Sequence, residues 1–224
     1  WTSPRISPST LITARPRQGE TTLRTGDLLE LIDKNADQVA LVIIGALNFF
    51  TGQLFDIAQI AAAAQARGRI VGIDLAHAAG NVPLALHDWN VDFAVWCSYK
   101  YLNSGPGAVA GAFIHQRHAT NRDLPRLAGW WGNDPATRFR MQLEPDFVPV
   151  PSADSWQVSN PPILAMAPLR SSLAIFDEAG GMAPLRAKSI QLTGYLEFLL
   201  DQIPSQLFRV ITPRQPNERG AQLS

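Results

Sequence analysis

An aspartate and a lysine each follow an apolar run with the composition of a buried strand. Asp74 ends the run 69–74, and Lys100 comes shortly after the run 93–98. Ligands of open parallel sheets bind beyond the carboxyl ends of the strands, so both side chains are expected at one such edge. A carboxylate and an amine placed there suit pyridoxal phosphate. The amine forms a Schiff base with the aldehyde, and the acid pairs with the pyridine nitrogen so that the ring can accept electrons.

Taken singly, both residues also have ordinary explanations. An aspartate at the end of a strand is commonly a helix cap, and a lysine in a loop is usually a solvated charge. The wider sequence pattern therefore has to decide between these explanations and a cofactor site.

Other site chemistries find little support. The single cysteine, Cys97, allows neither an intramolecular disulfide nor a cysteine-based zinc site. The glycines at 105, 107 and 111 do not match the dinucleotide-binding fingerprint. Three histidines are too scattered to suggest metal ligands: His87, His115 and His118. No metal site is expected.

The charge and hydropathy of the chain bear on its partners and location. Lys and Arg number 19 and Asp and Glu number 19, and this formal net charge of zero argues against a nucleic-acid partner. No apolar run reaches the roughly 18 residues that span a bilayer, and the first residues do not read as a secretion signal. We therefore expect a cytoplasmic protein with no membrane partner. Charged residues make up only 17% of the chain, which indicates surface buried in an interface.

Strands and helices alternate along the first half of the chain. Four apolar runs are predicted strands: 39–44, 69–74, 93–98 and 108–114. Helices are predicted from residue 25 and over 54–67, where Gly68 ends the second one. The unbroken apolar character of 39–44 predicts a strand buried on both faces. Together these elements predict an α/β fold, with a largely parallel sheet and helices on both of its faces.

The remaining segments read differently. Residues 1–24 are predicted to form a loop or the tail of a missing element. Residues 129–162, rich in Trp, Pro and Gly, are predicted to form an ordered irregular segment. A long helical stretch is predicted over 163–203, with breaks near Gly180 and Pro184. Residues 207–212 read as a strand that begins a second domain. We therefore expect residues 1–185 to be part of a large domain, and 186–224 a connecting helix and the start of a small C-terminal α/β domain.

The chain resembles the kynureninases over essentially its whole length. Segments that match motifs of that family occur in the right order and spacing: 74–81 (DLAHAAGN), 86–89 (LHDW), 91–94 (VDFA), 96–103 (WCSYKYLN), 129–132 (GWWG) and 159–162 (SNPP). The resemblance implies the fold type I architecture of pyridoxal-phosphate enzymes, in the aspartate-aminotransferase-like superfamily. It also implies hydrolysis of the Cβ–Cγ bond of kynurenine or 3-hydroxykynurenine, giving anthranilate or 3-hydroxyanthranilate and alanine. That reaction belongs to tryptophan catabolism and NAD biosynthesis.

Matched positions carry the family's site residues. By resemblance, Lys100 and Tyr99 are the expected catalytic residues, and Lys100 holds the cofactor. The expected cofactor-binding residues include these two and four others: Asp74 at the pyridine nitrogen, His77 near the ring, Trp130 near the phosphate, and Asn160. Asn160 and Asn133 are the expected contacts of the substrate's aromatic end.

The sequence departs from the family in several respects. Members of the family are longer, so we expect this chain to lack the N-terminal segments that cup the phosphate and the C-terminal arginine that binds the substrate carboxylate. The chain as given is therefore expected to be inactive, whereas its full-length parent is expected to be active. In addition, Asn133 stands where relatives often have a histidine after the Gly-Trp-aromatic-Gly motif.

Two alternatives remain open at the level of sequence. One is another fold type I enzyme, such as a class V aminotransferase or a desulfurase, although those commonly have a histidine where this chain has Tyr99. The other is a non-catalytic, truncated subunit. Because fold type I sites usually lie at a dimer interface, we expect a homodimer whose 129–134 loop lies near the partner's site.

Overall fold

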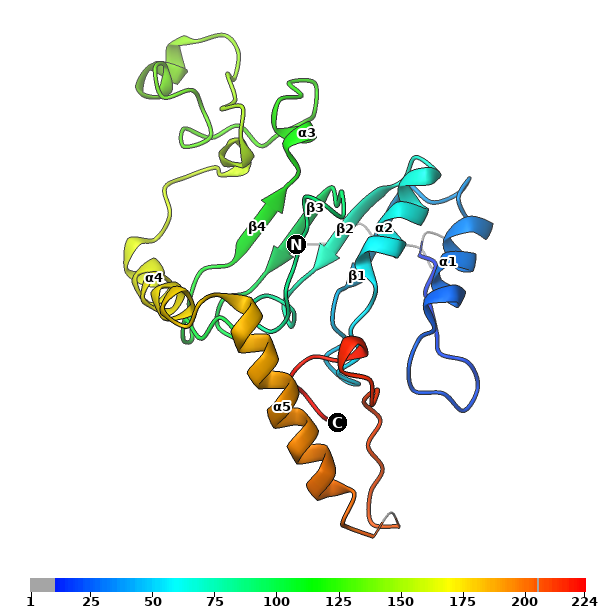
Figure 1. The fold of residues 1–224 in the computed structure, drawn as a ribbon. Coiled ribbons are helices and arrows are strands. Elements are labelled where there is room, and N and C mark those ends of the chain that lie inside the picture. Colours follow the sequence, from blue (N-terminus) through cyan, green and yellow to red (C-terminus); the bar gives the residue numbers. More distant parts are fainter. Residues whose placement is uncertain (1–10, 205) are drawn as a thin grey trace.

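A computed structural model describes residues 11–204 and 206–224 (Figure 1). Its helices and strands have these bounds: α1 (Thr25–Lys34), β1 (Leu41–Gly45), α2 (Ile57–Ala66), β2 (Ile70–Asp74), β3 (Phe93–Trp96), β4 (Gly111–Ile114), α3 (Gln116–Ala119), α4 (Ile163–Glu178) and α5 (Met182–Leu200). Three short 3-10 helices are η2 (Arg138–Leu143), η3 (Ala153–Trp156) and η4 (Pro216–Glu218). These bounds agree with the predicted order of helices and strands up to α5.

The four strands form one sheet in the order β1-β2-β3-β4. The first three are parallel, and β4 runs antiparallel to β3. This arrangement confirms a largely parallel α/β sheet. It also sends the chain after β4 to the edge of the sheet opposite the carboxyl ends of β1, β2 and β3, because β4 runs in the reverse direction.

Helices α1 and α2 cover one face of the sheet (Figure 1). The core there joins side chains of both helices to the alternate residues of the strands that point toward them, such as Val71, Ile73 and Ala94, all 0% exposed. Burial of these side chains is the main free-energy term that holds the helices on the sheet.

On the opposite face of the sheet, apolar side chains are exposed. Leu41 is 44% and Ile43 60% exposed, and Ile70 and Val95 are similarly accessible. The prediction that residues 39–44 are buried on both faces is therefore wrong. The reason is that none of the described helices packs over this face, since Ile70 and Val95 on the interior strands β2 and β3 are exposed there as well.

Residues 207–212 do not form a strand, which corrects the prediction for this segment. A strand requires a neighbour for its backbone groups, and here Ile211 N donates to Ser224 O and Thr212 Oγ1 accepts from Ser224 N. The segment instead returns along α5 toward the end of β1 (Figure 1). The proposed domain boundary at 185/186 falls inside α5 and stays a prediction. Within the described residues, no helix is long and apolar enough to cross a membrane.

A buried carboxylate fastens the segment after β4 to the sheet. Asp92, with an 8% exposed side chain, accepts hydrogen bonds from Val71 N (2.7 Å), Arg117 Nη2 (2.5 Å) and His118 Nε2 (2.6 Å). Burial raises the pKa of Asp92, but the bonds from Arg117, His118 and Val71 together outweigh it and hold the pKa below its usual range.

This carboxylate makes stability depend on pH in a predictable direction. A pKa that is lower in the folded state contributes stability above the unfolded pKa of about 3.9, and that stability is lost as the pH falls through the folded value. We expect Asp92→Asn to lower the free energy of unfolding at pH 7 by about 2 to 3 kcal/mol. Denaturant titrations at pH 7 and near pH 3 will show the difference between variant and wild type shrinking in acid.

The exposed Asp88 provides the control for this experiment, since its side chain is 83% accessible. Asp88→Asn is expected to behave as the wild type at both pH values. If Asp92→Asn lowered the free energy of unfolding by the same amount in acid as at pH 7, the charge of Asp92 would not be what stabilises the fold.

Candidate active site

The parallel strands place Asp74 and the lysine loop at one edge of the sheet. Asp74 is the last residue of β2 and pairs in register with Val95 of β3. Leu75 N continues the ladder by donating to Val95 O at 2.8 Å. Chain leaving β3 therefore emerges beside Asp74 and leads within four residues to Lys100.

The loop that carries Lys100 is held by internal hydrogen bonds. Ser98 is fully buried and donates to Val109 O at 2.5 Å. Ser104 N donates to Ser98 O at 3.0 Å, and Asn103 N to Lys100 O at 3.0 Å, with Asn103 in the left-handed region at φ 54°. Tyr99 is 53% exposed. The Lys100 Nζ atom lies 5.8 Å from the centroid of the Tyr99 ring, so the side chains of the two predicted catalytic residues lie close together.

His77 lies on the turn that follows Asp74 at the end of β2. The turn that carries it packs tightly on the lysine loop, because a Cβ on Gly80 (φ +80°) would lie 2.6 Å from Tyr101 O. Burial lowers the pKa of His77, the positive charge of Lys100 lowers it further, and Asp74 opposes both. His77 therefore lies within electrostatic range of both predicted partners, and its imidazole is neutral at pH 7.

Two aromatic residues that the sequence analysis did not select also border His77. The ring centroid of Phe49 lies 6.0 Å from that of His77, and the Tyr101 ring lies 6.3 Å away in an edge-on arrangement. Burial raises the pKa of Tyr101. The rule that identified Asp74 would also have identified Phe49, since Phe49 lies in the loop directly after β1.

The remaining predicted residues lie elsewhere. Trp130 contacts Trp131 at 5.4 Å and Phe139 at 5.9 Å, within the 121–157 segment that projects beyond β4 and α3, away from the carboxyl ends of β1 to β3 (Figure 1). Within the described chain, the aromatic partners of the Trp130 ring are Trp131 and Phe139, and they belong to this segment rather than to the Asp74–Lys100 edge.

Asn133 and Asn160 differ in their accessibility. Asn133 is 1% exposed; its Nδ2 donates to Thr137 Oγ1 at 3.0 Å and its Oδ1 accepts from Val148 N at 3.1 Å. Its amide is thus engaged inside the loop. Asn160 is exposed just before α4 and accepts from Ser159 Oγ at 3.1 Å. Substrate contact by either residue stays a prediction.

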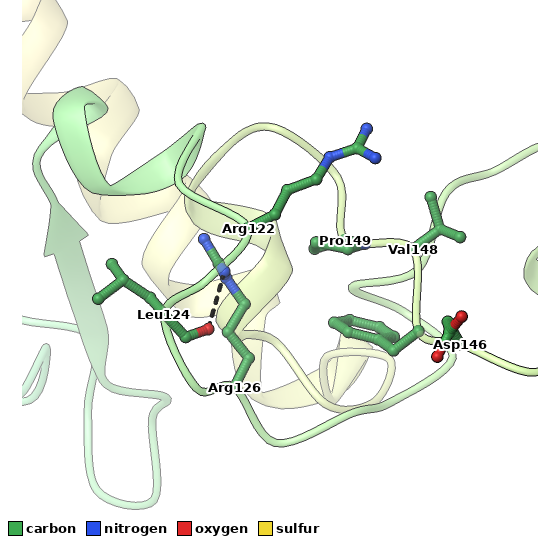
Figure 2. Close-up of a pocket in the computed structure, with 7 residues that line it drawn as sticks. Arg122, Leu124, Arg126, Asp146, Val148 and Pro149 are labelled. Atoms are coloured by element: carbon green, nitrogen blue, oxygen red, sulfur yellow. Dashed lines mark hydrogen bonds between the residues drawn. The ribbon is translucent and has the colours of Figure 1, made fainter.

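A hollow of about 470 Å³ lies away from the Asp74–Lys100 edge, within the 121–149 segment (Figure 2). Arg126 crosses it and donates to Leu124 O, but its guanidinium also bonds Asn121 O (2.7 Å) and His118 O (2.9 Å) and stacks on Trp156. Arg126 is therefore a structural residue of this segment, and the hollow brings no acid–amine pair together.

The edge formed by Asp74, His77 and Lys100 fits the reactive part of pyridoxal phosphate. Asp74 Oδ1 accepts from Ala76 N at 2.7 Å, which fixes the carboxylate, and a carboxylate is the group that pairs with the pyridine nitrogen of the cofactor. His77 Nδ1 is buried and has no hydrogen-bond partner among the described residues, so a polar group of a ligand could satisfy it. No cluster of His, Cys, Asp and Glu in the described chain could hold a metal ion.

The fold is that of a fold type I pyridoxal-phosphate enzyme, and the chain belongs to the class-V aminotransferase family, whose family model matches residues 11–223. Solved structures of the same fold include the cysteine desulfurase of Thermococcus onnurineus (TM-score 0.66, 16% identity, 90% of this chain and 46% of that one). Another is an alanine–glyoxylate aminotransferase of Nostoc (TM-score 0.60, 18% identity, 89% and 48%).

Curated relatives of much higher identity are named kynureninases. The chain is 60% identical to the kynureninase of Myxococcus xanthus, over 94% of this chain and 49% of the relative. It is 57% identical to that of Salinispora tropica, over 96% and 50%. These similarities confirm the kynureninase resemblance seen in the motifs, and the chain spans about half the length of these relatives.

Proposed function

We propose that the full-length protein containing this chain is a kynureninase that hydrolyses the Cβ–Cγ bond of kynurenine or 3-hydroxykynurenine. The observation that carries the proposal is the meeting of Asp74, His77 and Lys100 at one sheet edge in a chain 60% identical to a curated kynureninase. The products are anthranilate or 3-hydroxyanthranilate, and alanine. We place the reaction in tryptophan catabolism and NAD biosynthesis, in the cytoplasm, with no nucleic-acid or membrane partner.

Each residue of the edge has a defined task. Bound pyridoxal phosphate supplies an electron sink for the carbanions that form beside the amino-acid nitrogen. Lys100 holds the cofactor through Nζ and, once substrate releases it, takes the proton from the substrate's α-carbon. Asp74, fixed through Oδ1 by Ala76 N, holds the proton on the ring nitrogen. Neutral His77 offers its free Nδ1 to a polar group of the bound ligand.

Product analysis of the full-length protein tests this proposal. With pyridoxal phosphate and either kynurenine, the aryl acid and alanine are expected in equal amounts. Cysteine should release no sulfide, and an amino acid with a 2-oxo acid should exchange no amino group. Sulfide release or amino exchange without cleavage of kynurenine would favour one of the other fold type I activities. A protein that binds cofactor but turns over none of these would contradict the proposal.

We further propose a homodimer in which the 121–157 segment serves the partner's site. Support comes from the projection of this segment away from its own Asp74–Lys100 edge (Figure 1). Its apolar side chains are also exposed, as shown by Leu127 (80%), Phe139 (80%) and Leu143 (76%). Trp130, on this segment, is the residue proposed to approach the partner's cofactor.

Mixing inactive variants tests the shared site. Lys100→Ala and Trp130→Ala are each expected to be nearly inactive. Hybrid dimers have one site that lacks both residues and one intact site, so mixed, re-associated protein should recover about a quarter of wild-type activity. Sedimentation should show a dimer. Recovery of no activity from verified hybrid dimers, or full activity in a monomer, would contradict the shared site.

A further inference from the structure

The C-terminal residues 218–222, hereafter the strap, run back along the sheet edge that holds the candidate site. The strap pairs with the turn that follows β1, since Leu54 N donates to Glu218 O at 2.8 Å and Gly220 N to Gly52 O at 3.2 Å. Figure 1 shows the C-terminal segment lying next to this turn, far in sequence from it. A segment distant in sequence thus becomes part of the site's support.

Asn81 links the strap to the turn that carries His77. Its side chain is buried (4% exposed); Nδ2 donates to His77 O and Oδ1 accepts from Ala221 N, both at 3.0 Å. Gly220 makes this close approach possible, because a Cβ there would lie 2.8 Å from Asn81 Nδ2. One amide therefore bonds a site residue's backbone on one side and the strap on the other.

Gln222 links the strap to the turn after β1 that carries Phe49. Its Nε2 donates to Phe49 O at 2.7 Å, and the Phe49 ring borders His77. Gly52, at φ +71°, lets the strap approach, since a Cβ there would meet Gln222 O at 3.0 Å. The turn that carries His77 and the turn that carries Phe49 are thus held by the same five-residue segment.

The strap is itself fixed to α5. Arg219 is 2% exposed and donates through Nη1 to Glu197 Oε2 at 2.9 Å. From the same helix, Arg186 Nη2 donates to Arg219 O at 2.7 Å. The strap is therefore a fixed support, connected to the long helix.

We propose that the strap positions both site turns, and that Asn81 is the positioning residue through which it sets the place of His77. This inference rests on the proposed function for its cofactor, but its contacts do not. Because coupling between two sites is reciprocal, cofactor binding beside His77 must stabilise the docked strap by as much as the docked strap favours the cofactor.

Asn81→Ala in the full-length protein tests the coupling. In the wild type, pyridoxal phosphate should slow hydrogen exchange of the backbone amides in 218–222. In Asn81→Ala, which loses the bonds to both His77 O and Ala221 N, this slowing should be largely lost. The dissociation constant for pyridoxal phosphate should rise about tenfold or more. Exchange in 75–80 should also become faster without any cofactor.

The chain offers a matched control. Asn35 at the end of α1 makes the same type of bond, from Nδ2 to the carbonyl four residues earlier, Leu31 O, at 2.7 Å. Asn35→Ala should leave the cofactor's dissociation constant and the exchange of 218–222 as in the wild type. Equal behaviour of the Asn81 and Asn35 variants in both measurements would overturn the proposal.

A second variant covers the case in which Asn81→Ala does not fold. Gln222→Ala removes the bonds from Nε2 to Phe49 O and to Ser224 Oγ, neither of which involves the turn that carries His77. It should therefore speed exchange in 46–54 while leaving 75–80 unchanged. Uniform speeding across both turns, or none, would contradict separate links from one strap. Should the wild type bind no pyridoxal phosphate, the proposed function fails, whereas exchange in 75–80 without cofactor still decides whether Asn81 positions His77.

Discussion

Replacement of Lys100 by alanine will abolish turnover of kynurenine and covalent attachment of pyridoxal phosphate in the full-length protein. In the proposed function, Nζ is the nucleophile that holds the cofactor and the base that moves the substrate's α-proton, and alanine can do neither. We expect the steady-state rate to fall by at least about 10³-fold, in the range that loss of a covalent nucleophile causes. The visible absorbance of the lysine-bound cofactor should disappear.

The other two lysines of the chain provide controls. Lys34 forms an ion pair with Glu30 on α1, and Lys188 lies on α5, so neither belongs to the Asp74 edge. Lys34→Ala and Lys188→Ala should keep both the absorbance and the rate. A borohydride-stable adduct that persists in Lys100→Ala would show that a different lysine of the protein holds the cofactor.

The second large effect is expected for Asp74→Asn. The substitution keeps the shape and the acceptor for Ala76 N. It removes the negative charge that we propose holds a proton on the ring nitrogen. Carbanions then lose most of their delocalisation, and we expect turnover to fall by about 10²-fold or more. Cofactor should remain attached, since Lys100 anchors it independently.

Measurement of the rate and the bound cofactor together checks this prediction. The matched control is Asp56→Asn, because Asp56 also accepts a backbone N–H with its carboxylate, from Gln59 N at 3.0 Å, but caps α2. Asp56→Asn is expected to keep the wild-type rate. Wild-type turnover in Asp74→Asn would mean that Asp74 acts only as a cap, and that another group pairs with the ring nitrogen.

Local sequence patterns were sufficient to predict the four strands of the sheet, and they placed Asp74 at the end of one of them. One apolar run ends at Asp74, and another is followed within a few residues by Lys100. Both residues therefore lie at predicted strand ends. Parallel pairing then brings such ends together whatever the rest of the fold does. The role of His77 came from the family resemblance, and the structure adds that burial lowers its pKa.

What the sequence could not predict depends on contacts between distant segments. An unbroken apolar run at 39–44 does not reveal that β1 is an edge strand with Ile43 60% exposed. Nor does the β-like composition of 207–212 reveal that Ile211 N bonds to Ser224 O rather than to a neighbouring strand. Asn81 has no composition signal, since its role depends on a strap about 140 residues away.

Trp130 and Asn133 show a different limit. Motif resemblance assigned both to the site. The chain reverses at β4, however, and the segment that carries them leaves the sheet at the end opposite Asp74 and Lys100. Sequence order alone cannot say whether a site residue serves its own chain or a partner. The projecting 121–157 segment favours a role for Trp130 in the partner's site, and the mixing experiment tests that role.

Location of the cofactor on the wild-type chain tests the central claim most directly. Full-length protein is loaded with pyridoxal phosphate, reduced with borohydride and digested, and the labelled peptide is sequenced by mass spectrometry. The Asp74–Lys100 edge predicts a single reduced adduct, on the peptide that contains Tyr99, Lys100 and Tyr101. An adduct on any other lysine, with none on Lys100, would contradict this account of the site.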